Sequence, residues 1–322
     1  MAGASGEVST ADGEAARRGA WDAAGPPFET IALNRPALPE RSPLKVTVLN
    51  AHGGAHIAAI ADCLKRPPLG EVGTILLCEA SWRTRRHGRI KFAPELAEAL
   101  GMSFAFAPSF GVSGNDGQFR ATGVAILCAQ PLENVRTIAL PRPSLRFRRY
   151  RLPGVPQVLL ARVNVGGRRV WIGVIHLDRL CGPVWRALQM ERFLAELETE
   201  VPTILGGDLN TTTVDMDKPW ALARAVATVA IRPRRFREPQ AWEPLFERLR
   251  ECGFTVDDAN VPRAPTFTFS RWVPPLWRPK LDWVMSRGIR PVSGSPRVIP
   301  AHPARFGRRF SDHDFVTCEF RL

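Results

Sequence analysis

Residues of metal-binding and acid–base type stand at the ends of several apolar segments of this sequence. Asn50 follows KVTVL, Glu79 follows TILLC and His176 follows VWIGVI. The later members of this set are Asp208 and Asn210 in GGDLN, Asp282 in LDWVM, and Asp312 and His313 in SDHDFV. Because strands of one sheet bring their ends to a common edge, we expect these side chains to converge in one pocket.

The carboxylates in this set indicate a hard divalent cation. Glu79, Asp208 and Asp312 would supply the oxygen ligands that Mg²⁺ or Mn²⁺ prefers, whereas the sparse cysteines argue against a zinc site. Each motif alone is weak, because a single acid at a strand end is more often a turn former or a helix cap. GGDLN is stronger, since Gly206 and Gly207 would let the backbone turn sharply and aim two polar side chains at one point.

The composition is that of a folded, strongly basic protein. The chain has 322 residues, 45% of them hydrophobic, which is enough for a substantial core. Lys and Arg number 44 against 31 Asp and Glu, a formal charge of +13, which favours polyanions or anionic surfaces. Nucleic acid and phospholipid headgroups both fit this charge, and a compositional bias without a function is the alternative.

The six cysteines are scattered without a C-x-x-C pair, so neither a disulfide framework nor a zinc site is expected. No stretch approaches the roughly 20 apolar residues of a membrane span, and the first residues do not have the pattern of a signal peptide. We therefore expect a soluble, monomeric protein of the cytoplasm.

Residues 1–40 contain few large apolar side chains and are expected to form a disordered tail before one catalytic domain at 41–322. Short apolar segments predict strands at KVTVL, TILLC, GVAIL, VLLARVNV, RRVWIGVI, PTILGG, LDWVM and DFVTCEF. Longer periodic segments predict helices at 55–65, 94–100, 184–198 and 242–252. Gly166 and Gly167 predict a hairpin turn. The alternation of strands and helices indicates a layered α/β (α+β) sandwich with mixed sheets.

Two arginine-rich segments, Leu140–Arg151 and Ile231–Arg237, combine Arg with Pro and isolated aromatic residues. Such segments suit loops that grip phosphates and stack on bases, which makes Arg146, Arg148 and Arg149 candidate substrate-binding residues. The alternative is a solvated loop whose Arg stems cover apolar surface. The segment Ser270–Lys280 contains two tryptophans that either dock at a membrane interface or cap the core.

The motifs together resemble the endonuclease/exonuclease/phosphatase superfamily over roughly residues 44–322. In order, these motifs are VLN at Asn50, CE at Glu79, GVAIL, IHLD, GGDLN, LDWV and SDHDFV. The resemblance implies a four-layer αββα sandwich of two mixed, mainly antiparallel sheets that hydrolyses phosphate esters with Mg²⁺ or Mn²⁺. The chain departs from the family at Cys78, where many relatives have Gln, and at Val124, where many have Asn. Its single tyrosine, Tyr150, lies in the basic segment and not ahead of GVAIL.

The resemblance also implies roles for the site residues. Glu79 would hold the metal directly, with Asn50 and Asp312 close by. His313 would pair with Asp282, and Asp208 would activate the attacking water. Asn210 and His176 would donate hydrogen bonds to the non-bridging phosphate oxygens.

The substrate remains open between classes at this stage. A phosphodiesterase that acts on nucleic acid is favoured by the charge and by the arginine-rich segments. A phospholipid or sphingomyelin-type diesterase that works at an anionic membrane surface is the alternative. A third reading is an inactive module that binds nucleic acid or membranes, and the full set of acidic and histidine residues argues against it.

Overall fold

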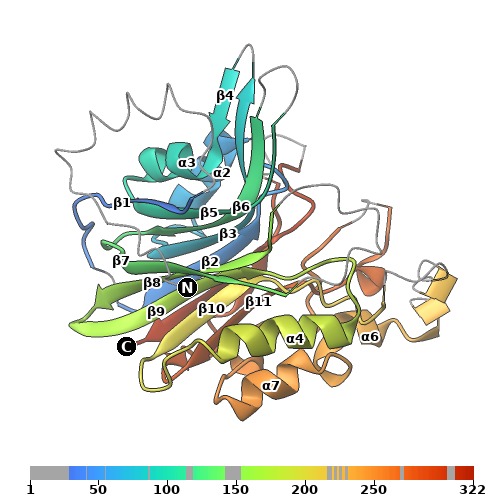
Figure 1. Cartoon of the computed structure of the whole chain (residues 1–322). Coiled ribbons are helices and arrows are strands. Elements are labelled where there is room, and N and C mark those ends of the chain that lie inside the picture. The colour runs from blue at the N-terminus through green and yellow to red at the C-terminus, as the bar shows by residue number, and fades with distance from the viewer. Residues whose placement is uncertain are drawn as a thin grey trace.

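The computed structural model describes residues 29–322 except 41, 55, 86–87, 114–118, 142–153, 216–219, 221–222, 225–226, 229–230, 269–271 and 303–308. Its centre is a pair of sheets packed face to face (Figure 1). The larger sheet contains β1 (Ile31–Leu33), β2 (Leu44–Asn50), β3 (Thr74–Arg85), β4 (Gly88–Lys91), β5 (Ser103–Ser113), β6 (Phe119–Cys128), β12 (Arg290–Pro291), β13 (Arg297–Ile299) and β14 (Phe315–Arg321). The smaller sheet contains β7 (Glu133–Ala139), β8 (Gln157–Val165), β9 (Arg168–His176), β10 (Thr203–Asp208) and β11 (Asp282–Arg287).

Most strand pairs in both sheets are antiparallel, and each sheet has one parallel pair. The larger sheet runs β1-β5-β6-β3-β2-β14-β12, with β4 paired to β3 and β13 to β14. The smaller runs β11-β10-β9-β8-β7. The pair β2/β3 and the pair β9/β10 are parallel. The parallel strands of each pair therefore end at the same edge of their sheet.

Helices cover the outer face of each sheet. On the larger sheet lie α2 (Ile57–Lys65) and α3 (Phe92–Leu100), and on the smaller sheet α4 (Pro183–Leu194) and α7 (Leu245–Glu251) (Figure 1). The short helices are α6 (Arg234–Arg237), η2 (Pro239–Ala241), η3 (Asp257–Ala259) and η4 (Pro275–Trp277). No helix in the described ranges is long and apolar enough to cross a membrane.

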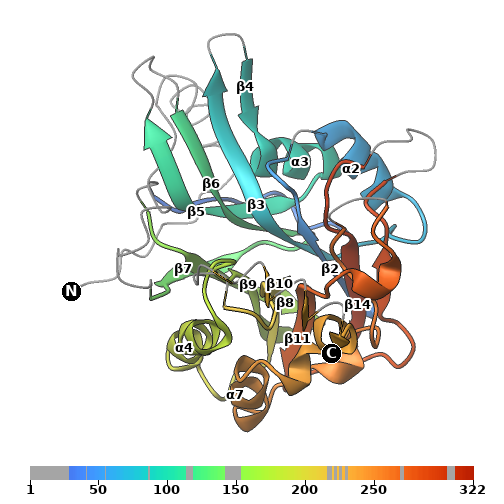
Figure 2. The same cartoon turned by 90° about the vertical axis from the view of Figure 1, so that its right-hand side faces the viewer.

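The core has three layers because the central strands are apolar on both faces. One layer lies between α2, α3 and the larger sheet, the second between the two sheets, and the third between the smaller sheet and α4 and α7. This arrangement confirms the predicted αββα sandwich. Figure 2 shows β2 and β14 of one sheet beside β10 and β11 of the other.

All eight predicted strand segments are strands, and the β8–β9 hairpin turns at Gly166 and Gly167, whose φ angles are 60° and 73°. The edge strand β1, however, pairs with β5 and buries Leu33, so residues of the expected tail belong to the sheet. The expected boundary at residue 40 therefore lies too far along the chain. Residues 1–28 lie outside the described part.

Candidate active site

Three predicted site residues occupy one row across the smaller sheet. Asp208 at the end of β10 pairs in register with His176 at the end of β9 and with Asp282 at the start of β11. Residues directly opposite one another in a sheet point to the same face. The row therefore places an imidazole and two carboxylates side by side at one edge.

Gly206 and Gly207 allow this row to form by close approach of backbones. Both lie inside β10 and not in a turn, which corrects the expectation from the sequence. A Cβ atom on Gly206 would lie 2.6 Å from Val48 Cγ2 of the other sheet. On Gly207, with φ of 149°, it would lie 1.8 Å from the carbonyl oxygen of Ile175. Only glycine lets the sheets and strands pack this tightly before Asp208.

Asn50 links the two sheets at the same edge. Its Nδ2 donates to Asp208 Oδ2 at 2.9 Å and lies 3.4 Å from Glu79 Oε1. Glu79 stands at an irregularity of β3 between Leu77 and Ala80, where the register with β6 shifts, and its φ is 51°. A positive φ is costly for a residue with a side chain, and such strain is concentrated at functional sites. The bulge turns the half-buried carboxylate of Glu79 toward Asn50.

His313 and Asp282 form a buried pair. His313 Nδ1 lies 2.7 Å from Asp282 Oδ2, and both side chains are buried. Ser311 Oγ accepts a hydrogen bond from the His313 backbone N–H and donates to the carbonyl of Asn50 at 2.6 Å, which ties SDH to the end of β2. The Phe267 ring packs against the imidazole, with centroids 4.7 Å apart.

The pair favours a protonated imidazole. Burial acts to lower the pKa of His313, but the carboxylates of Asp282 and Asp208 outweigh it and raise this pKa to about 10. Burial raises the pKa of Asp282 to about 6. At neutral pH the pair is therefore an imidazolium with a carboxylate.

Asp208 lies among the other polar groups of the site. Its Oδ2 is 3.5 Å from His176 Nε2 and 3.7 Å from His313 Nε2. Its Oδ1 accepts the backbone N–H of Asn210 at 2.9 Å. Asn210, with φ of 48°, donates its side-chain amide to the carbonyl of Leu177. His176, Asp208, Asn210, Asp282 and His313 are thus brought together.

Two groups of ligand atoms are candidates for a metal ion. Asp208, Asp282 and His313 offer atoms within 4.8 Å of one another. The contact between His313 Nδ1 and Asp282 Oδ2 is a hydrogen bond, so an ion that leaves this bond intact would have to use the other ligand atoms of the two residues. Asp312 Oδ1 is buried and makes no hydrogen bond with a described residue, although the ring nitrogen His52 Nδ1 lies 3.2 Å from it. Asp312, Glu79 and Asn50 offer only oxygen ligands, which suit a hard cation better than a set that includes an imidazole nitrogen.

His52 is a site residue that the sequence analysis left without a role. Its Nδ1 lies 3.2 Å from Asp312 Oδ1, and its backbone N–H donates to Asn50 Oδ1 at 3.1 Å. The tight turn that begins after Asn50 produces these contacts, with positive φ at His52, Gly53 and Gly54. The Gly-Gly pair after VLN was the available signal for that turn.

A buried ion pair supports the loop that follows Asn210. Arg186 on α4 donates to Glu243 with both side chains fully buried, at 2.5 Å between Nη2 and Oε1. Glu243 Oε1 also accepts the backbone N–H of Thr213 at 2.8 Å, and Thr213 has a φ of 58°. The pair thus fixes the strained loop beside the catalytic row.

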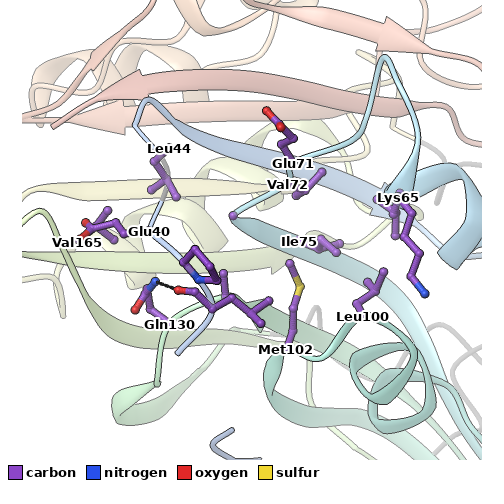
Figure 3. Close-up of a pocket in the computed structure, with 15 residues that line it drawn as sticks. Glu40, Leu44, Lys65, Glu71, Val72, Ile75, Leu100, Met102, Gln130 and Val165 are labelled. Carbon is purple, nitrogen blue, oxygen red and sulfur yellow. Dashed lines mark hydrogen bonds between the residues drawn. The ribbon is translucent and has the colours of Figure 1, made fainter. Parts of the chain in front are cut away.

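A pocket of about 280 Å³ opens next to the cluster. It contains Glu79 and His176 and continues past Phe110, Pro156 and Arg179. A second pocket, of about 320 Å³, lies where β2 and β3 begin, beside Leu44, Ile75 and Met102 (Figure 3). Because Asn50 and Glu79 stand further along these strands, the second pocket is separate from the cluster.

The arginine-rich segments have different outcomes. Arg146, Arg148 and Arg149 lie outside the described residues, as does most of Leu140–Arg151. In the segment Ile231–Arg237, four residues form α6 instead of a loop. Phe236 is buried, so it is a core residue and cannot stack on a base. In Ser270–Lys280, Trp272 is 80% exposed and does not cap the core, whereas Trp277 is 46% exposed and about half covered by the protein.

Known proteins resemble this chain in both sequence pattern and fold. The model of the Endonuclease/Exonuclease/phosphatase family matches residues 49–313, a range that contains every described site residue. No curated protein matches the sequence.

Solved structures share the fold at low sequence identity. An endonuclease/exonuclease/phosphatase structure from Beutenbergia cavernae DSM 12333 is 19% identical with a TM-score of 0.61, covering 88% of this chain and 72% of that one. An AP endonuclease from Archaeoglobus fulgidus is 15% identical with a TM-score of 0.53, covering 87% and 100%. TDP2 from D. rerio, complexed with single strand DNA product, is 16% identical with a TM-score of 0.51, covering 88% and 100%.

Proposed function

Because the chain belongs to the endonuclease/exonuclease/phosphatase family, we propose that it is a divalent-metal-dependent phosphodiesterase that acts on nucleic acid. The observation that carries the proposal is the convergence of Asp208 with the His313–Asp282 pair and with Asn50 from the opposite sheet. Such a site combines a proton acceptor, a proton donor and carboxylates that suit a cation.

Glu79, Asn50 and Asp312 would hold the ion, either Mg²⁺ or Mn²⁺. The buried Oδ1 of Asp312, which makes no hydrogen bond with a described residue, supports this assignment. When bound, the ion supplies Lewis-acid polarisation of a phosphoryl oxygen and stabilises the leaving alkoxide.

The protein side chains would handle the protons and the developing charge. Asp208 would accept a proton from the attacking water, since its Oδ2 lies among the polar groups of the site, 3.7 Å from Nε2 of the His313 imidazolium. The His313 imidazolium would donate from Nε2 to a phosphoryl oxygen, while Asp282 fixes Nδ1. His176, 3.5 Å from Asp208, and Asn210 would donate to the non-bridging oxygens.

Nucleic acid is favoured as substrate by the formal charge of +13. Two structures of similar fold support the choice, since their names describe an AP endonuclease and a protein with a single strand DNA product. A phospholipid-type diesterase draws support from the exposed Trp272. A module that binds without turnover is the candidate from another class.

The decisive experiment measures hydrolysis of bis-p-nitrophenyl phosphate, a single-stranded oligonucleotide, plasmid DNA and sphingomyelin side by side, with Mg²⁺, Mn²⁺ or EDTA. We expect metal-dependent hydrolysis of bis-p-nitrophenyl phosphate and of the oligonucleotide, and also of plasmid DNA if the enzyme accepts a duplex. Asp208→Asn and His313→Gln should each lower kcat by roughly 100-fold or more, because general acid–base groups contribute that much. Asp258→Asn, an exposed carboxylate on η3, is the matched control.

Wild-type turnover in both site variants would refute the proposal. Turnover of sphingomyelin alone would assign the phospholipid function, and EDTA-insensitive binding of DNA without hydrolysis of any substrate would assign the binding module.

A further inference from the structure

We infer that α6 and η4 together form a surface that binds an unpaired nucleic-acid strand beside the catalytic cluster, with Arg232 and Arg234 on phosphates and Trp272 and Trp277 stacked on bases. This inference rests on the proposed function, because it names the form of nucleic acid that the same site would receive. The four residues are called the arginine–tryptophan surface below.

The two elements are neighbours although they are distant in sequence. Helix α6 packs against η4, and the Lys280 backbone N–H donates to the carbonyl of Phe236 at 2.9 Å. Phe236 is buried and anchors α6, so its flanking arginines are held at the surface. The residues Arg234–Arg237 therefore form a helix that is held against η4.

The loop that carries the tryptophans is attached directly to the catalytic residues. The Thr268 backbone N–H donates to the carbonyl of Asp312 at 2.8 Å, and Arg278 braces the loop by donating to the carbonyl of Val273 at 2.8 Å. Trp272 is four residues from Thr268. Its Cα atom therefore lies within about 14 Å of the Cα atom of Thr268.

The arginines of the surface offer charge without internal partners. The side chains of Arg232 and Arg234 are exposed, and neither guanidinium group makes a hydrogen bond or an ion pair with the part of the chain that the structure describes. Arg235 beside them is engaged with Thr213, and burial followed by the like charge of Arg224 lowers the pKa of Arg235. A cluster of like charges of this kind is relieved by an anion, and a phosphate chain supplies a series of them.

The exposure of the tryptophans favours stacking over insertion into a bilayer. Trp272 is 80% exposed, but Leu276 and Trp277 are only 47% and 46% exposed, so the protein already covers about half of each. Insertion into a membrane needs a contiguous group of projecting apolar side chains. Base stacking needs only one free aromatic face per base, and it tolerates any sequence.

The test measures binding of a fluorescein-labelled single-stranded oligonucleotide to the full chain by anisotropy in EDTA, where no turnover occurs. Trp272→Ala/Trp277→Ala should raise the Kd by roughly 5- to 150-fold for each base that loses its stacking partner. Trp272→Phe/Trp277→Phe should restore most of the binding. Trp272→Leu/Trp277→Leu should not, because leucine keeps the apolar surface without the ring.

The arginine pair is tested through salt dependence. Arg232→Gln/Arg234→Gln should reduce the slope of log K against log salt by about 1.4, since each phosphate contact on a single strand contributes about 0.7. Matched controls are Arg168→Gln/Arg169→Gln at the exposed start of β9 and Val184→Ala/Leu188→Ala on the exposed face of α4. These controls should bind like wild type, and all variants should keep wild-type hydrolysis of bis-p-nitrophenyl phosphate.

The inference would be overturned if the tryptophan-to-alanine variant bound the oligonucleotide as tightly as the α4 control does. Binding to phosphatidylserine vesicles that alanine abolishes and leucine restores, with oligonucleotide binding unchanged, would also overturn it and identify a membrane interface. If wild type hydrolyses no phosphodiester but shows the predicted binding pattern, the proposed function fails and the surface stands.

Discussion

Asn50 Nδ2 donates a hydrogen bond to Asp208 Oδ2 over 2.9 Å, from the larger sheet to the smaller one. Both side chains are buried, with exposed fractions of 1%. The bond therefore fixes the position of the candidate general base relative to the strand that leads into Glu79 and the metal ligands. This one contact therefore contributes both to the stability of the sandwich and to the geometry of the site.

Asn50→Ala should destabilise the protein, because Asp208 Oδ2 would lose a donor in a buried position. Loss of a hydrogen bond to a charged group costs roughly 1.5–3 kcal/mol in the free energy of unfolding. Urea denaturation followed by circular dichroism measures it. Asn164→Ala, at an exposed position of β8, should change the same quantity by less than about 0.5 kcal/mol. Equal effects of the two substitutions would show that the inter-sheet bond contributes nothing.

Addition of Mg²⁺ or Mn²⁺ to the metal-free protein should raise the Tm. A ligand at 100 times its Kd stabilises the folded state by about 2.7 kcal/mol. Glu79→Gln and Asp312→Asn should abolish most of this rise, whereas Asp258→Asn should keep it. A Tm rise that survives both substitutions but disappears in Asp282→Asn would place the ion in the Asp208–Asp282–His313 group instead.

His313 should remain protonated well above neutral pH in the metal-free protein. Its pKa in the folded state, about 10, exceeds the ordinary value of 6.5, so the folded state binds this proton more tightly than the unfolded state. The resulting stabilisation is fully present below pH 6.5 and is lost as the pH rises toward 10. In Asp282→Asn burial is opposed by fewer carboxylates, so the pKa should fall.

Nitrogen-15 NMR of labelled histidine in EDTA follows this titration directly. A neutral His313 imidazole at pH 8 in the wild-type protein would contradict the ion-pair assignment.

Gly207→Ala should prevent correct folding. The new Cβ atom would lie 1.8 Å from the carbonyl oxygen of Ile175, and backbone cannot yield that far without breaking the β9–β10 pairing. Gly167→Ala is the matched control, because it has a φ of 73° and nothing within 4 Å of its Cβ position. It should cost only about 1 kcal/mol of backbone strain. Soluble yield and thermal melting distinguish the two, and a Gly207→Ala protein that melts like the control would be inconsistent with the close approach.

Strand ends were the part of the site that the sequence could predict. Short apolar segments locate β2, β9, β10 and β11, and the polar residues at their ends follow from the same reading. The structure brings Asn50, Asp208, Asp282 and His313 together, as that reading predicted. The assignment of individual roles to them stays a prediction.

Other features depend on contacts that no local pattern records. Strand β5 was not predicted because Pro108 and Ser109 interrupt its apolar sequence. In the structure, the pairing of β5 with β6 shifts register between Pro108 and Phe110, so the strand continues past this interruption. His52 reaches Asp312 only because a tight turn returns the chain to a residue 260 positions away. The contact of α6 with η4 likewise joins segments that are distant in sequence, through the hydrogen bond from the Lys280 backbone N–H to the carbonyl of Phe236.

The in-register row of His176, Asp208 and Asp282 links the chemistry to strand alignment. Successive side chains of a strand point to opposite faces, so a slip of β10 by a single residue would turn Asp208 away from both neighbours while most backbone hydrogen bonds could form again. A misaligned molecule would keep its sheet spectrum and lose its proton acceptor. Turnover per mole of protein would therefore count the molecules whose strands are correctly aligned, which spectroscopy of secondary structure cannot do.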